Sequence, residues 1–253
     1  MLEKNLERLI FFGTALRYLQ DATSRYLLKK GSPGWGTVEN LRSFLEHLDE
    51  LGLTVTKRAA YKLEKFKSEL EGDTDELLSM EKAAELQKIM HELRPTLVAE
   101  SSGMIAYIIS ERRFRIDHLM SNTESLFAKS VFNKLPSIAR GDFSESSKCL
   151  AFERPTAAAF HMLRATEAVL RHYYCEKIKR KRSPLMWGAM IVSMRTMPKR
   201  FPKVIINQLD HIRDGFRNPT SHPEMVYDIE GAEDLLSICI DASNRMIQDL
   251  DKK

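Results

Sequence analysis

Cysteine is scarce in this sequence. Its three residues, Cys149, Cys175 and Cys239, stand far apart along a chain of 253 residues. No pair has the short spacing of a zinc cage or of a disulfide framework, so we expect no bound metal and a reducing, cytoplasmic setting. Long apolar runs are also missing, and the first residues lack the basic and apolar segments of a secretory signal. We therefore expect a protein that is neither secreted nor membrane-spanning.

Several motifs of nucleotide- and metal-dependent enzymes are absent as well. The sequence contains no Gly-rich phosphate loop, no H-E-x-x-H and no G-x-S-x-G, which excludes ATPases, zincins and serine hydrolases of those kinds. No cofactor is expected. The formal net charge of +4 permits an anionic partner without requiring one.

Proline and glycine are infrequent, at nine and eleven residues, and the apolar residues between them recur mostly at three- and four-residue spacing. This periodicity is typical of amphipathic helices, so we predict an all-α fold. The expected helices cover about residues 2–29, 37–51, 57–70, 74–94, 116–120, 141–151, 155–179, 184–196, 202–217 and 228–250.

The expected helix ends have local causes. A proline disfavours helical geometry in the residue before it, so we expect helices to end at about Arg94, before Pro95, and at about Arg217, ahead of Pro219. Asp228 is the expected N-cap of the last helix, because its carboxylate can accept a hydrogen bond from a free backbone N–H there.

Residues 96–110 form the expected joint of the chain. Two short apolar runs around a glycine are compatible with a small β-hairpin or with a continuing helix. We place an N-terminal helical regulatory or interaction region at residues 1–110 and a second helical domain at residues 111–253. Residues 111–136 give no clear pattern beyond the short helix at 116–120.

Glu167 is expected within the apolar stripe of the helix at 155–179. A carboxylate there is costly unless it has a partner. Arg164 and Arg171 lie about one turn away on either side, within reach of an ion pair. The simpler interpretation is an ordinary ion pair within the helix, with the acid at the edge of the stripe.

Arg217 and His222 have the side chains best suited to chemistry. They flank a short polar loop stiffened by proline, which lets the two side chains converge. A guanidinium offers fixed donors to phosphoryl oxygens, and an imidazole exchanges a proton near neutral pH. The pair therefore suits metal-free RNA cleavage by attack of the 2′-hydroxyl. In the alternative interpretation, Arg217 pairs with Asp214 and His222 makes a single hydrogen bond in the loop.

These residues resemble a known superfamily. The run from Arg217 to His222 is similar to the R-x4-6-H motif of HEPN domains, with Asn218 as the polar residue that this family favours after the arginine. Glu167 and Arg171 resemble the E-x3-K element of some HEPN toxins, with arginine in place of lysine. The similarity, which extends to HEPN-like bacterial proteins, covers roughly residues 141–250 and not the N-terminal half.

The resemblance implies an antiparallel bundle of four or five helices that acts as a homodimer, in which two motifs build one composite site. It implies a metal-independent endoribonuclease that leaves 2′,3′-cyclic phosphate and 5′-hydroxyl ends. The role is toxin-like, in bacterial stress or phage defence, with an antitoxin or defence protein as partner. Arg217 then stabilises phosphate charge, His222 is the general acid or base, Asn218 orients the motif or the phosphate, and Glu167 and Arg171 support the site.

Two other functions stay open at this point. Some HEPN proteins are catalytically inactive scaffolds or bind nucleotides or proteins, and the same helices suit that role. A helical structural protein, in which Arg217 and His222 only fix a loop, is the third hypothesis.

Basic residues are concentrated between Lys177 and Arg217, where only two acids, Asp210 and Asp214, oppose them. Such a surface attracts RNA through the release of counterions. The residues expected to bind RNA are Lys179, Arg180, Lys181, Arg182 and Arg213. Alternatively, residues 179–182 are only a solvated loop between helices.

Overall fold

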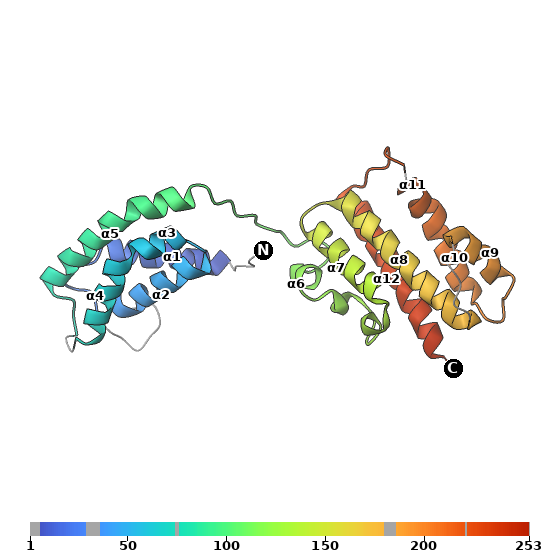
Figure 1. The fold of residues 1–253 in the computed structure, drawn as a ribbon, viewed down its shortest axis with the longest axis horizontal. Helices are drawn as coiled ribbons and strands as arrows, with labels where there is room; N and C mark the ends of the chain where they lie inside the picture. The colour runs from blue at the N-terminus through green and yellow to red at the C-terminus, as the bar shows by residue number, and fades with distance from the viewer. Residues whose placement is uncertain (1–5, 29–35, 74–75, 180–185, 221, 253) are drawn as a thin grey trace. The chain divides into compact units, whose positions relative to one another are not determined.

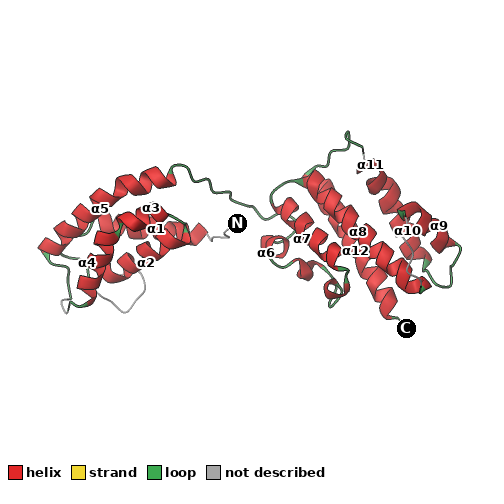
Figure 2. Cartoon of the chain, viewed as in Figure 1, coloured by secondary structure: helices red, strands yellow, loops and turns green. Residues whose placement is uncertain are grey.

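The computed structural model describes residues 6–28, 36–73, 76–179, 186–220 and 222–252. The chain divides into two compact units, Met1–Ala106 and Tyr107–Lys253, each with its own hydrophobic core (Figure 1). The domain boundary expected from the sequence lies after residue 110. Within the described ranges the structure is helical and contains no strand, apart from one isolated antiparallel bridge between Leu27 and Leu77 (Figure 2). The all-α prediction is confirmed.

The N-terminal unit packs its helices around one apolar core. Leu19, Leu41, Phe44, Leu63 and Leu86 are almost completely buried in it. The helices are α1 (Leu6–Gln20), α2 (Thr37–Glu50), α3 (Thr54–Ala59), α4 (Tyr61–Glu71) and α5 (Met80–Ser101). The helix predicted at 57–70 is thus two helices that meet at Ala60.

The first helix is shorter than its apolar pattern predicts. It ends at Gln20 and does not continue to residue 29. The chain that follows bonds instead to the segment before α5: Leu28 N donates to Glu76 O at 2.9 Å, and Leu78 N donates to Tyr26 O at 2.9 Å. These distant partners satisfy backbone groups that a longer helix would have paired locally. Between the first two expected helices, at residues 30–36, only Gly36 falls within the described residues.

Pro95 does not end the fourth predicted helix. α5 continues through it to Ser101, and Leu93 and Leu97 are buried on either side of the proline at helical spacing. Proline removes one backbone donor from a helix, and we infer that burial of this stripe outweighs that loss. Residues 96–101 are therefore helical and residues 102–110 form no strand, so of the two alternatives for residues 96–110 the small hairpin is wrong and the helix continues, as far as Ser101.

The C-terminal unit contains the longer helices. Residues 111–136, which gave no clear pattern, hold α6 (Ile116–Met120) and the 3-10 turns η1 (Thr123–Leu126) and η2 (Phe132–Lys134). The elements that follow are α7 (Ser137–Ala151), α8 (Pro155–Ile178), α9 (Trp187–Arg195), α10 (Lys203–Ile212), η3 (Arg213–Arg217), α11 (Asn218–Thr220) and α12 (Ile229–Asp251).

The long helix α8 lies between α7 and α12 (Figure 1). A tight connection makes α7 and α8 antiparallel, whereas α12 runs in the same direction as α8. Near their beginnings, Tyr227 N donates to Thr156 Oγ1 at 3.2 Å, and near their ends Tyr173 Oη donates to Asp249 Oδ2 at 2.6 Å. The bundle is therefore mixed in direction, because the α9–α11 segment returns the chain to the start of α8 before α12 begins.

The helix that leads to Arg217 does not end there. After α10 the turn η3 is π-helical, and α11 continues through Pro219 to Thr220. A proline clashes with the carbonyl four residues earlier in an α-helix, and a wider turn relieves that crowding. The expected end at Arg217 is wrong for this reason. Thr220 then closes the segment, since its hydroxyl lies 2.7 Å from Tyr227 Oη.

Candidate functional site

The carboxylate of Glu167 joins two arginines from different elements. Its side chain, on α8, is only 16% exposed. Arg171 donates from Nη2 to Glu167 Oε1 at 2.5 Å, and Arg217 Nη2, at the end of η3, lies 3.5 Å from Oε2. The pairing with Arg171 that helix spacing suggested is present. Arg217 is a second partner, which lies fifty residues away in the sequence and which spacing within one helix could not reveal.

The π-helical turn sets the direction in which Arg217 points. An additional residue per turn rotates the side chains that follow by roughly 100° relative to a regular α-helix. Arg217 is the last residue of this turn, so its position toward α8 depends on η3. The contact between Arg217 and Glu167 therefore depends on the π-helical conformation of η3.

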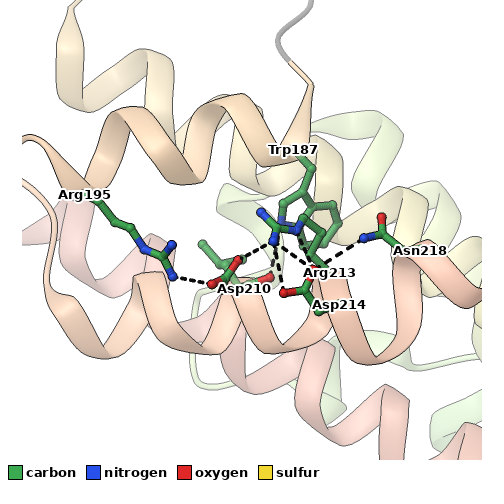
Figure 3. A network of polar contacts seen from close by, with 7 residues as sticks. Trp187, Arg195, Asp210, Arg213, Asp214 and Asn218 are labelled. Carbon is green, nitrogen blue, oxygen red and sulfur yellow. Dashed lines mark hydrogen bonds and ion pairs between the residues drawn. The ribbon is translucent and has the colours of Figure 1, made fainter.

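Figure 3 shows a second polar network, which connects α9 to α11. Asp210 pairs with Arg195 on one side and with Arg213 Nη2, at 3.0 Å, on the other. Arg213 also donates to both carboxylate oxygens of Asp214, at 2.9 and 3.0 Å. Asn218 Nδ2 donates to Asp214 Oδ1 at 3.4 Å, which ties the residue after Arg217 to this network.

His222 lies in the turn that follows α11. Its backbone N–H donates to Pro219 O at 2.9 Å, and its carbonyl accepts from Met225 N at 3.1 Å. These bonds hold the backbone on both sides of His222, while the residue itself is exposed. An exposed imidazole on a closed turn can reach a ligand or a second chain.

The residues predicted to bind RNA have different environments. Lys179 is exposed at the end of α8, where it adopts a left-handed conformation, and Arg213 is held between Asp210 and Asp214 with a mostly buried side chain. Arg180, Lys181 and Arg182 lie outside the described residues.

Sequence reasoning missed a cluster around Asp142. This carboxylate, on α7, is only 2% exposed. It accepts hydrogen bonds from Arg164 Nε at 2.6 Å and from Arg164 Nη2, and it lies 2.9 Å from His161 Nδ1. Arg164 therefore pairs with Asp142 and not with Glu167. The only sequence signal was an aspartate on the inward face of a helix, which needs a partner but does not name one.

The pKa of the Asp142 carboxyl reflects this environment. Burial acts to raise the pKa, but the hydrogen bonds from Arg164 and His161 outweigh burial and lower it below its ordinary value. Asp142 is thus ionised at neutral pH. It holds one edge of the Arg164 guanidinium and lies beside Nδ1 of His161.

The described residues offer neither a metal site nor a membrane-spanning helix. No three His, Cys, Asp or Glu side chains gather there closely enough to hold a metal ion, and no helix there has the length and apolar character needed to span a bilayer.

Comparison of the chain with protein-family models, with curated proteins and with solved structures found no match.

Proposed function

We propose that the C-terminal unit is a HEPN-type domain and that the protein is a metal-independent endoribonuclease, toxin-like in bacterial stress or phage defence. The observation that carries this proposal is the contact of Glu167 with both Arg171 and Arg217. This contact supports a site in which Glu167 orients the guanidinium of Arg217, the first residue of an R-x4-H segment whose histidine, His222, is exposed. An oriented guanidinium is suited to phosphate because it needs little rearrangement when charge develops.

The proposed reaction is a transesterification within RNA. His222 takes the proton of a ribose 2′-hydroxyl, whose oxygen then forms a bond to the adjacent phosphorus. The bond from phosphorus to the 5′ oxygen breaks, and that oxygen receives a proton from an acid. Arg217 balances the additional negative charge of the five-coordinate phosphorus. The products are a 2′,3′-cyclic phosphate and a 5′-hydroxyl.

The reaction needs both a base and an acid, and a single R-x4-H segment offers one imidazole. We infer that two copies of the chain each contribute Arg217 and His222 to one site. In this arrangement Asn218 keeps the segment in register through Asp214, and Glu167 acts as a positioning residue through Arg217.

The test is cleavage of end-labelled RNA by the purified full-length protein in the presence of EDTA. We expect Arg217→Ala and His222→Ala each to lower kcat/KM by about 100-fold or more, since each removes a group that acts in the transition state. Arg245→Ala and His91→Ala, which alter exposed residues elsewhere, are matched controls that should cleave like the wild type.

Glu167→Gln separates positioning from folding. It keeps the size of the side chain but removes the charge that holds Arg217, so kcat should fall by up to about 100-fold while KM and the unfolding midpoint stay close to wild type. A wild-type protein that leaves diverse RNAs intact would exclude the nuclease. The inactive scaffold would then be the better explanation.

A further inference from the structure

Phe201 fixes the connection between α9 and α10 against the end of α8. Its side chain is completely buried. The ring stacks on Tyr174 with centroids 5.8 Å apart and an interplanar angle of 11°, and meets Tyr173 edge-on at 5.6 Å. Tyr174 Oη also lies 2.6 Å from Ser193 Oγ on α9. The start of α10 is therefore held beside the last turns of α8.

This packing gathers basic residues that are distant in the sequence. Lys199, Arg200 and Lys203 flank Phe201 and are exposed. Lys177 and Lys179 lie one to two turns after the tyrosines on α8, and Lys177 Nζ is 5.8 Å from the Tyr173 ring centroid. We call these five residues, Lys177, Lys179, Lys199, Arg200 and Lys203, the basic end.

Acids neutralise only part of the basic end. Lys177 pairs with Asp249 at 2.7 Å and Lys179 with Glu176 at 3.9 Å. Lys199, Arg200 and Lys203 form no ion pair with any residue that the structure describes. The whole C-terminal unit has the same bias, with 24 Lys and Arg against 18 Asp and Glu in residues 107–253. The three bases beside Phe201 are therefore the strongest attraction for an anion at this end.

The basic end is continuous with the proposed cleavage site. Lys203 begins α10, and α10 and η3 lead to Arg217 over a rise of about 21 Å, at about 1.5 Å per residue. The acids along this path, Asp210 and Asp214, are paired with Arg195 and Arg213 (Figure 3). The network of Figure 3 thus removes the negative charge that would otherwise repel a phosphate chain between the two sites.

We propose that the basic end binds the phosphates of single-stranded RNA and that the strand then follows α10 and η3 to Arg217. The identity of the ligand as RNA rests on the proposed function. The spread of the charges over two helices and a connection suits an extended polyanion, whose phosphates contact successive cations and release counterions. Of the residues predicted to bind RNA, Lys179 belongs to this surface, whereas Arg213 is held by Asp210 and Asp214.

The test uses the full-length protein and a fluorescent 2′-O-methyl RNA, which lacks the attacking hydroxyl and so reports binding without cleavage. The variant is Lys199→Gln, Arg200→Gln and Lys203→Gln combined. Its control, Arg58→Gln, Lys65→Gln and Lys88→Gln combined, removes the same charge from exposed residues of the N-terminal unit. The Kd is measured from about 50 to about 200 mM salt.

We expect the variant to weaken binding by about tenfold or more at the lowest salt. The slope of log K against log salt should decrease by about 2, because each phosphate contact to a single strand contributes about 0.7. The control should bind like the wild type. Equal binding by variant and control overturns the proposal, and so does a wild type that binds vesicles of anionic lipid but not RNA.

The two measurements also distinguish RNA binding at the basic end from RNA cleavage at Arg217 and His222. If RNA binding depends on the three bases but unmodified RNA is never cleaved, the nuclease proposal fails and the RNA-binding surface stands. If RNA is cleaved and the variant binds and cleaves like the wild type, the nuclease proposal stands and this surface is wrong.

Discussion

At the scale of single residues, two carboxylates of the C-terminal unit each bring together a pair of basic side chains. Glu167 draws together Arg171 and Arg217, and Asp142 draws together His161 and Arg164. Both carboxylates are less exposed to solvent than the basic side chains that they contact. A largely buried carboxylate is stable only with such partners, and it fixes their orientation in return.

Asp142→Asn should lower the free energy of unfolding by about 1–3 kcal/mol at pH 7. The amide keeps the volume of the side chain but cannot satisfy both cationic partners, and its own N–H donors are left without an acceptor. Urea denaturation of variant and wild type measures the difference. Asp241→Asn, at a half-exposed aspartate paired with Arg245, is the control and should change the free energy by less than about 1 kcal/mol. An unchanged midpoint for Asp142→Asn would show that the cluster does not stabilise the fold.

Because Asp142 titrates, the difference in the free energy of unfolding between the wild type and Asp142→Asn should depend on pH. The pKa of Asp142 is lowered in the folded protein, so its contribution is fully present above the pKa of an unfolded aspartate, about 3.9. It is lost as the pH falls from there through the folded pKa. The free-energy difference between the wild type and Asp142→Asn should therefore shrink on acidification below about pH 4.

At the scale of elements, helix ends follow local chemistry in some places and distant contacts in others. Asp228 caps α12 as predicted: its Oδ1 accepts from Gly231 N at 2.8 Å. The stop predicted near Pro95 fails because Leu97 adds a buried turn beyond it. At Pro219 the chain keeps its helical course by widening one turn.

Asp228→Ala should lower the free energy of unfolding by about 1 kcal/mol, because it leaves a backbone donor at the start of α12 without its acceptor. Asp228→Asn, which keeps a side-chain oxygen at the same place, should stay within a few tenths of a kcal/mol of the wild type. Chemical denaturation followed by circular dichroism compares the three proteins. Equal losses for the two variants would show that the charge, and not the cap, accounts for the effect.

At the scale of the whole molecule, the residues that the structure describes form two hydrophobic cores, and each is built from residues of one unit. Phe44 is buried in the core of the N-terminal unit, and Phe143 is buried in that of the C-terminal unit, where it meets Phe127 edge-on at 5.0 Å. Because the cores share no residue, a cavity in one removes packing only from that unit.

Phe44→Ala and Phe143→Ala should each lower the stability of their own unit by about 3–5 kcal/mol, through lost burial and the cavity left behind. Amide hydrogen exchange read by mass spectrometry assigns the change to peptides of one unit. We expect faster exchange in the helices of the mutated unit, with the other unit close to wild type. Matched acceleration in both units for both variants would mean that the two fold as one cooperative body.

Features that depend on neighbouring residues could be predicted from the amino-acid sequence. Helical periodicity located α2, α6, α8 and α12 to within a residue or two, and local cap chemistry identified Asp228. The pairing of distant groups is visible only in the folded chain: Asp142 with Arg164, Glu167 with Arg217, and Phe201 with the tyrosines of α8. The reason is physical. Backbone dihedrals and the 3.6-residue period are set within a few residues, whereas burial and ion pairing are settled between side chains that only the folded chain brings into contact.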